Sequence, residues 1–465
     1  MTKTINISSI FSFIKKALNS EHQDFTTGSI RRSVFLLAIP MILEMCMESV
    51  FAVVDIFFVN KLTDNPSLAT GTVVLTESMI TIVYSVAIGL SMAATAMVAR
   101  RVGEKNIAGA ARAGAQAILL SVFISIIISI AGLFFADDIL RLMGATEEIV
   151  AYGKVYAQIM FTGNVVIMLL FLLNGIFRGA GDASIAMKSL WIANLFNIIL
   201  CPVCIHFLGL KGAAIATTIG RGIGVMYQLY NLQKGKGIIK LHAKDFVPDP
   251  VVMKALLNVA GTATMQFIVA SASWIAMARI MASFGNNDSI AGYGIAIRII
   301  VFFIMPAWGL SNAAATLVGQ NLGAGQPLRA EQSVWKVAKY NAIFMGCVSV
   351  FFLFGADFFV GIINTNPTVM KTAVSALRII SLGYIFYGVG MVMMNAFNGA
   401  GDSKTPTLIN IFWFWLIQIP IAYYVAVVCK VGEIGVFLAI VFTETAVTIT
   451  SVIIFKRGKW KLVKI

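Results

Sequence analysis

Stretches of apolar residues long enough to cross a lipid bilayer recur along this chain, and they constrain its fold more than any other feature. A helix needs roughly 20 apolar residues to span the hydrocarbon core. Such windows lie near residues 34–59, 72–98, 113–135, 150–177, 184–207, 212–231, 253–284, 291–318, 337–357, 372–397, 405–429 and 433–455. Only 12% of the 465 residues are charged, about half the fraction usual in a soluble domain. The sequence therefore predicts an all-α integral membrane protein with twelve transmembrane helices.

The two halves of the chain resemble each other. The string GLSMAATAMVARRVG begins at Gly89, and GLSNAAATLVGQNLG begins at Gly309, a shift of 220 residues. The string GAGD at 179–182 returns at 399–402 with the same shift. An even number of spans in each half gives both copies the same orientation. We therefore expect two six-helix lobes related by a pseudo-two-fold axis along the membrane normal.

This organisation divides the chain into five segments. They are an N-terminal tail (1–33), an N-lobe (34–231), a linker (232–252), a C-lobe (253–455) and a basic tail (456–465). The N-terminal tail fits either a helix lying on the membrane surface or a disordered segment. Most of the 35 Lys and Arg residues fall on the side of the N-terminus. We therefore expect a multi-pass protein of the inner or plasma membrane with both termini in the cytoplasm.

Several functional classes find no support in the sequence. The formal net charge of +14 comes without a basic helix or an aromatic motif typical of RNA binding, so no nucleic-acid partner is expected. The five cysteines fall in apolar runs, and CPVC at 201–204 lacks the βαβ surroundings of a redox site. The three histidines are scattered, so we expect no metal site and no cofactor. No nucleophile–base pair or phosphate loop stands out, so the chain is not expected to be an enzyme.

The first predicted span carries a stripe of carboxylates. Glu44, Glu48 and Asp55 are four and seven residues apart, which places them on one face of a helix. An ionised side chain near the bilayer centre costs about 2.5–3.5 kcal/mol, so such residues usually face a cavity and have a function. A carboxylate there is either protonated or paired with a bound cation. Because H⁺ or Na⁺ can then displace an organic cation, the stripe indicates antiport.

Other residues of the predicted spans are candidates for the wall of such a cavity. Soft and aromatic side chains would supply adaptable contacts and cation–π surface: Met41, Met45, Met47, Met265, Trp274 and Trp308. Further charged residues in the spans are structural, pair with one another or line an aqueous vestibule: Glu77, Glu444, Arg279, Arg298 and Arg378.

From about residue 33 to 455 the chain resembles the multidrug and toxic compound extrusion (MATE) family. The resemblance rests on RGAGD before the fifth span, NGAGD before the eleventh and VVDIFFV in the first. It implies a V-shaped pair of six-helix lobes that exports cationic or amphipathic organic compounds in exchange for H⁺ or Na⁺. We expect small-molecule organic cations and membrane lipid as partners, and a monomeric protein.

The resemblance also assigns roles to single residues. Asp55 matches the coupling carboxylate of the first helix, and Asn197 and Thr217 match residues that join the same cation site. Cys201 stands where the family has Asp, and Gln266 stands where the NorM-like branch has Glu. The concentration of acids in the N-terminal half is similar to the DinF-like branch.

These departures bear on the coupling ion and on the cargo. Without a charge at Cys201, the site favours H⁺ over Na⁺, with Glu48 supplying the missing acid. The residues expected to contact the cargo are Glu44, Met41, Met45, Gln266 and Trp274.

Two alternative functions compete with drug export. A flippase for a lipid-linked saccharide, from the same wider superfamily, would carry Arg or Lys in its central cavity to hold the pyrophosphate. The acids of the first span instead favour cationic cargo. A channel is the other alternative, but the two-fold repeat with carboxylates between the lobes fits alternating access better.

Overall fold

A computed structural model describes residues 7–19, 24–62, 65–284 and 287–465. Helices and short connections make up this part of the chain. The first half contains α1 (Ile7–Leu18), α2 (Ile30–Leu62), α3 (Pro66–Gly103), α4 (Ile107–Leu142), α5 (Glu147–Thr162), α6 (Asn164–Ala180), α7 (Ala183–Leu208) and α8 (Leu210–Lys234). The second half contains α9 (Pro250–Ala282), α10 (Asn287–Gly323), α11 (Pro327–Ile363), α12 (Pro367–Ser381), α13 (Tyr384–Ala400), α14 (Lys404–Asn410), η2 (Ile411–Gln418), α15 (Ile419–Tyr423), η3 (Tyr424–Val428) and α16 (Glu433–Lys456). The segments η2 and η3 are π-helical. Two short 3-10 turns complete the structure: η1 (Ala243–Phe246) lies between the halves, and η4 (Lys459–Leu462) lies near the C-terminus.

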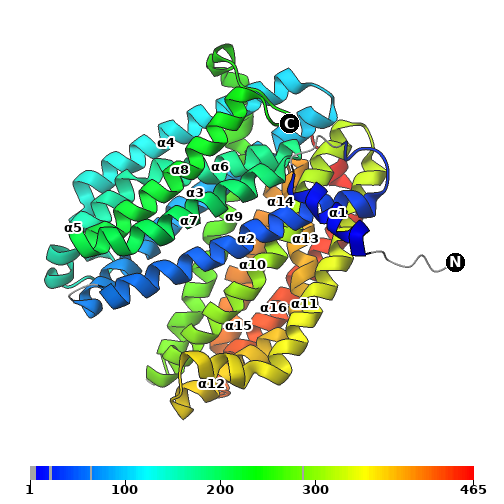
Figure 1. Cartoon of the computed structure of the whole chain (residues 1–465). Helices are drawn as coiled ribbons and strands as arrows, with labels where there is room; N and C mark the ends of the chain where they lie inside the picture. Colours follow the sequence, from blue (N-terminus) through cyan, green and yellow to red (C-terminus); the bar gives the residue numbers. More distant parts are fainter. Residues whose placement is uncertain (1–6, 20–23, 63–64, 285–286) are drawn as a thin grey trace.

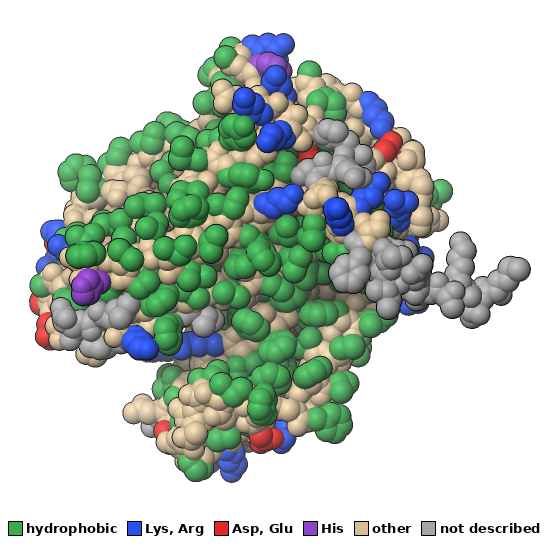
Figure 2. Space-filling view, viewed as in Figure 1, with side chains coloured by type: hydrophobic (Ala, Val, Ile, Leu, Met, Phe, Trp, Pro, Cys, Tyr) green, Lys and Arg blue, Asp and Glu red, His purple; other side chains and the backbone are tan. Residues whose placement is uncertain are grey.

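The helices form two bundles, an N-lobe (α2–α8) and a C-lobe (α9–α16). The lobes lie against each other near both termini and diverge toward α5 and α12 (Figure 1). A notch separates them at the diverging end (Figure 2). Ten helical stretches are long and apolar enough to span a membrane, and the pair α12–α13, bent by 60°, makes an eleventh. Together with the less apolar α8, which lies along α7, they confirm the predicted all-α fold of two six-helix lobes.

The repeated glycines of the sequence lie where the lobes touch. Gly89 of α3 faces α9, and a Cβ atom there would lie 2.7 Å from the backbone oxygen of Ala260. Gly309 of α10 faces α2, where a Cβ atom would clash with the backbone oxygen of Met41 and lie 2.8 Å from Cα of Ile42. The two contacts correspond to each other under the 220-residue repeat. Only glycine allows the backbones to approach so closely.

The repeated GAGD strings form helix ends. Gly181 ends α6 with φ +95° and Gly401 ends α13 with φ +86°, a left-handed conformation in which glycine costs least. The two aspartates that follow differ in their partners. Asp182 accepts a 2.7 Å hydrogen bond from the backbone N–H of Ile238, after α8. Asp402 accepts a 2.6 Å bond from the hydroxyl of Thr405 in α14. The GAGD part of each string therefore has a structural role here.

The C-terminal residues bridge the lobes at the end where they touch. The guanidinium of Arg100, in α3, donates to the backbone oxygen of Val463. Lys461 lies 2.5 Å from the carboxylate of Glu331 in α11. Trp460 is almost fully buried and stacks on Phe455 of α16, with the ring centroids 4.7 Å apart. These contacts hold both lobes to the same short segment.

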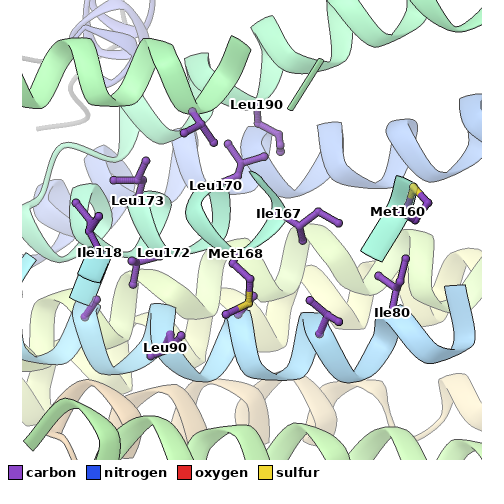
Figure 3. Packing of buried hydrophobic residues seen from close by; sticks show 14 of the residues in the cluster. Ile80, Leu90, Ile118, Met160, Ile167, Met168, Leu170, Leu172, Leu173 and Leu190 are labelled. Atoms are coloured by element: carbon purple, nitrogen blue, oxygen red, sulfur yellow. The ribbon is translucent and has the colours of Figure 1, made fainter. Parts of the chain in front are cut away.

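The N-lobe packs around α6. Leu170, Leu172 and Leu173 are fully buried among side chains of α3 and α4 (Figure 3). The first half of α2 belongs to a different core. Its residue Met41 is fully buried in a cluster built mainly from α10, α11 and α13. Helix α2 therefore joins the two lobes rather than packing with the N-lobe alone.

Candidate functional site

A cavity of about 650 Å³ lies between the lobes, within the size range of sites for drug-sized molecules. Its wall comes from α2, α3, α5, α6 and α8 of the N-lobe and from α10 and α13 of the C-lobe. The apolar part of the wall includes Met45, Phe51, Tyr84, Met92, Phe302 and Trp308. Close backbone contacts between the lobes at Gly103 of α3 and Gly323 of α10 close the end of the molecule that holds the termini. The cavity therefore opens toward the diverging end.

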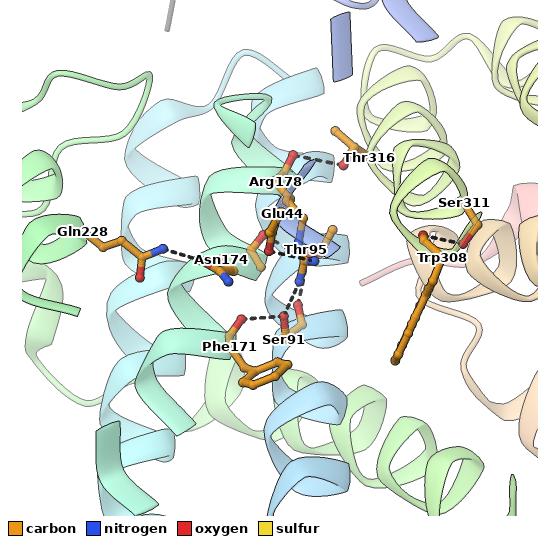
Figure 4. A network of polar contacts seen from close by, with 11 residues as sticks. Glu44, Ser91, Thr95, Phe171, Asn174, Arg178, Gln228, Trp308, Ser311 and Thr316 are labelled. Carbon is orange, nitrogen blue, oxygen red and sulfur yellow. Dashed lines mark hydrogen bonds and ion pairs between the residues drawn. The ribbon is translucent and has the colours of Figure 1, made fainter. Parts of the chain in front are cut away.

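Glu44 is held by an arginine from another helix. Its Oε1 atom lies 3.5 Å from Nη1 of Arg178 in α6, and the Glu44 side chain has no exposed surface. Arg178 also donates a 3.0 Å hydrogen bond to the hydroxyl of Ser91 in α3, and its backbone oxygen accepts one from Thr316 in α10 (Figure 4). Arg178 lines the cavity, whereas Glu44 lies behind it. The pair sits where three N-lobe helices meet the C-lobe.

Glu48 is paired in the same way. Its Oε1 atom lies 3.2 Å from Nη2 of Arg221 in α8, a side chain with only 3% exposure. The guanidinium lies over the rings of Phe51 and Tyr84, 4.5 Å and 5.6 Å from their centroids. Such stacking adds to the attraction between the charges. Both members of the pair line the cavity.

The cavity wall carries both basic and acidic side chains. Arg178, Arg221 and Arg298 line it together with Glu48 and Glu77. The acids of the first span are therefore accompanied by arginines from other helices on this wall. Sequence reasoning missed Arg178 and Arg221 as partners, although both carried a signal. Arg178 is the arginine of RGAGD, and Arg221 lies within the predicted sixth span.

The Glu48–Arg221 pair provides a stability prediction. Glu48→Gln should lower the free energy of unfolding by about 3 kcal/mol, because it removes the negative charge that faces the buried Arg221 guanidinium at 3.2 Å. This value is at the lower end of the energies usual for breaking a buried ion pair, because the Glu48 side chain is still 17% exposed. The double variant Glu48→Gln/Arg221→Gln should regain most of this loss. Denaturant unfolding of the purified variants measures both effects.

An exposed pair serves as the matched control. Asp357 lies 2.5 Å from Arg378, with side-chain exposures of 62% and 44%. Asp357→Asn should cost less than about 1 kcal/mol, as is usual for surface ion pairs. If Glu48→Gln costs no more than Asp357→Asn, the buried pair does not have the importance assigned to it.

The structure brings two of the predicted coupling residues together. Nδ2 of Asn197 in α7 donates a 3.3 Å hydrogen bond to the hydroxyl of Thr217 in α8. The other amide atom of Asn197, Oδ1, is buried and has no hydrogen-bond partner within the described part of the chain. Cys201 is fully buried one turn further along α7. Asp55 belongs to α2, but its side chain lies outside the described residues. The assignment of these four residues to a coupling site stays a prediction.

The residues predicted to contact the cargo separate into two groups. Met45 lines the cavity. Glu44 and Met41 are fully buried beside it, and Gln266 is buried in α9. Trp274 lines a different, smaller cavity inside the C-lobe. This conformation therefore places only Met45 of the group on the cavity wall, and a cargo contact by the others stays a prediction.

The fold and the cavity together define a class of protein. Two repeat-related six-helix lobes, with a drug-sized cavity between them that opens at one end, are the architecture of a secondary transporter. Residues 40–203 and 262–424 match the MatE family model, one segment in each lobe. The chain belongs to this family, and the predicted MATE membership is confirmed. The DinF-like branch stays a prediction.

Curated relatives cover the chain almost completely. A probable multidrug resistance protein, YpnP of Bacillus subtilis (strain 168), is 23% identical over 444 residues, or 95% of this chain and 98% of the relative. A probable multidrug resistance protein, NorM of Thermotoga maritima, is 23% identical over 97% of both chains. The multidrug export protein MepA of Staphylococcus aureus (strain NCTC 8325 / PS 47) is 21% identical over 92% of this chain and 94% of its own.

Solved structures share the fold. A crystal structure of MATE in the straight conformation has a TM-score of 0.88 and 24% identity, and covers 94% of this chain and 98% of its own. An outward-facing multidrug resistance MATE family transporter of the MOP superfamily has a TM-score of 0.88 and 24% identity, over 95% and 99% of the chains. A MOP superfamily transporter from Pyrococcus furiosus Vc1, described as having a binding pocket of reverse polarity, has a TM-score of 0.87 and 23% identity, over 96% and 100%.

Proposed function

We propose that this protein is a secondary active antiporter that exports amphipathic organic compounds, organic cations among them, in exchange for H⁺ or Na⁺. The observation that carries the proposal is the 650 Å³ cavity between two repeat-related lobes, closed at one end by glycine contacts and open at the other. Alternating access requires such a cavity to open to each side in turn. The multidrug names of the relatives support the same cargo class.

The orientation in the membrane forms part of the proposal. Lys and Arg collect on the side of the termini, which favours a cytoplasmic location for both ends. The cavity then faces the outside of the cell, and the structure represents an outward-open state of a plasma-membrane exporter. A reporter fused at the C-terminus should read cytoplasmic, and a signal from outside the cell would reverse this orientation.

The residues around Asn197 favour H⁺ as the coupling ion. Asn197 and Thr217 offer neutral oxygens, and Cys201 replaces a family carboxylate beside them. Na⁺ prefers a site with several oxygen ligands and enough negative charge, whereas a proton needs only one carboxylate. Asp55 would be that carboxylate. It would either bind a proton or form an ion pair with the positively charged cargo.

The test is transport by the purified protein in proteoliposomes. A fluorescent lipophilic cation serves as the cargo, and H⁺ and Na⁺ gradients are imposed separately. We expect the pH gradient to drive cargo movement and the Na⁺ gradient alone to have little effect. Movement driven by Na⁺ alone would contradict the choice of ion. No movement under either gradient would contradict antiport.

A second candidate function is a flippase for a lipid-linked saccharide. The observation that favours it is the set of arginines on the cavity wall, of which Arg298 has no ion-pair partner among the described residues. Guanidinium groups bind phosphate well, and one structural neighbour is described as having reversed pocket polarity. Competition in the same vesicles separates the two functions. Export should be inhibited by a second lipophilic cation under our proposal, and by a long-chain alkyl phosphate if the protein is a flippase.

A further inference from the structure

A second, small cavity lies within the C-lobe, away from the central one. Its volume is about 20 Å³, which is enough for a single water molecule. Trp274 of α9, Tyr384 and Tyr387 of α13 and Glu444 of α16 contribute its polar atoms, and the rest of its lining is apolar. A half-buried carboxyl group thus lies beside a small cavity within a membrane-spanning bundle. Neither the proposed coupling site nor the cargo cavity uses it.

Glu444 differs from the other acids described in the membrane-spanning helices. Glu44 and Glu48 each have an arginine within 3.5 Å. In the described part of the chain, by contrast, no hydrogen bond or ion pair to the Glu444 carboxyl group is found. It lies eleven residues into α16, near the middle of that helix. An ionised carboxylate without a partner is costly at this depth, so a function is the default explanation.

The groups that surround Glu444 contain no fixed positive charge among the described residues. The titratable side chains that face it are Tyr384 and Tyr387 of α13. Helix α9 contributes Trp274, helix α10 contributes isoleucines, and none of α14, η2 and α15 adds a charged side chain to the lining. Tyr384 is only 2% exposed, and its hydroxyl has no hydrogen-bond partner within the described residues. An unsatisfied donor and a carboxyl group without an ion pair therefore line the same small cavity.

The small cavity lies at a break in a membrane-spanning helix. Helices α12 and α13 meet at a bend of 60°, where Leu382 and Gly383 donate to Ile379 and Ile380 in tighter, three-residue turns. Gly383 packs closely on α16, since a Cβ atom there would lie 3.3 Å from a side-chain carbon of Val441. Broken helices of this kind free backbone groups, and transporters use them to form ion sites.

The other copy of the repeat lacks these groups. Gly163 corresponds to Gly383, and Asn164 corresponds to Tyr384. Asn164 is satisfied there, donating to the backbone oxygen of Ser125 at 3.1 Å and to the hydroxyl of Ser129 at 2.8 Å. In the last helix of each lobe the shift is larger, since Gly209 before α8 corresponds to Gly432 before α16. The position of Glu444 is therefore taken by Arg221, the guanidinium that pairs with Glu48. The N-lobe thus folds at this place without a carboxyl group, so the fold alone does not demand Glu444.

We propose that Glu444, together with the hydroxyls of Tyr384 and Tyr387, is a second proton-binding site, located in the C-lobe at the bend between α12 and α13. The inference rests on the proposed antiport function and deepens it. The carboxyl group is neutral while the cavity is closed to water, and it releases its proton to water when the bend opens. One proton enters from one side of the membrane and leaves to the other, so charge and atoms balance. The site adds one proton to each transport cycle.

The test compares proton counts in the full-length protein. In proteoliposomes, the opposing cargo gradient that just stops transport at a fixed pH difference gives the number of protons per cargo molecule. Glu444→Gln should lower this number by one and should keep exchange of labelled for unlabelled cargo without a gradient. The infrared band of a buried protonated carboxyl group should disappear in the same variant. Thr445→Val, which removes only a hydroxyl bonded to Val441 on the same helix, should match the unchanged protein.

Each result supports or overturns the inference. An unchanged proton count and an unchanged infrared band in Glu444→Gln would overturn it. If Glu444→Gln does not fold, Tyr384→Phe decides, because it removes one hydroxyl and should shift the carboxyl band and the pH dependence of transport. No shift in either would overturn the inference. Failure of the antiport proposal itself gives a different result: the unchanged protein then moves no cargo when either the pH gradient or the Na⁺ gradient is imposed.

Discussion

Asp55→Asn should abolish export driven by an ion gradient, down to the level of protein-free vesicles, while the protein still folds and inserts. The amide keeps the size of the side chain and most of its hydrogen bonding, and a neutral group is easier to insert than an anion. It cannot release a proton or balance a cation, so the step in which a proton replaces the cargo at this site is lost. Exchange of labelled for unlabelled cargo without a gradient should persist.

The matched control is an aspartate outside the cavity. Asp138, near the end of α4, has 70% side-chain exposure, and Asp138→Asn should transport normally. Glu48→Gln/Arg221→Gln provides the opposing case, since it removes Glu48, which lines the cavity, together with the arginine that pairs with it. Normal export by Asp55→Asn, together with loss of export in that double variant, would move the coupling site to Glu48.

The architecture was predictable because its determinants are local and repeated. Window length alone identifies a membrane span, and the strings that begin at Gly89 and Gly309 are alike enough to identify the two copies of the repeat. The same glycines lie at the lobe contacts. Periodicity also placed Glu44 and Glu48 on one helix face, and in the structure an arginine neutralises each of them.

The pairing of charges was not predictable from periodicity. A helical pattern gives the face on which a residue lies but not the helix that packs against that face. Arg178 is 134 residues from Glu44, and Arg221 is 173 residues from Glu48. The same limit explains Trp274, whose helix α9 turns it into the C-lobe rather than toward the central cavity.

Gly309→Leu should reduce export about 5- to 150-fold. In this conformation a side chain at Gly309 would meet the backbone of Met41 and Ile42 in α2, and overpacking typically costs about 1–3 kcal/mol. That penalty falls only on states in which the lobes touch at the end with the termini. It therefore shifts the equilibrium between the two conformations about 5- to 150-fold toward the one in which this end is open. Gly89→Leu, its counterpart in the repeat, should act alike through Ala260 of α9.

The control lies on the same helix. No atom lies within 4 Å of a Cβ atom built at Gly294 of α10, so Gly294→Leu should leave transport unchanged. Distances between spin labels at the diverging ends of α5 and α12 measure the conformational shift directly. They should shorten in Gly309→Leu and Gly89→Leu and stay constant in Gly294→Leu. If transport falls while these distances do not change, the glycines matter for folding or insertion, and the contacts they form are not the moving gate that alternating access requires.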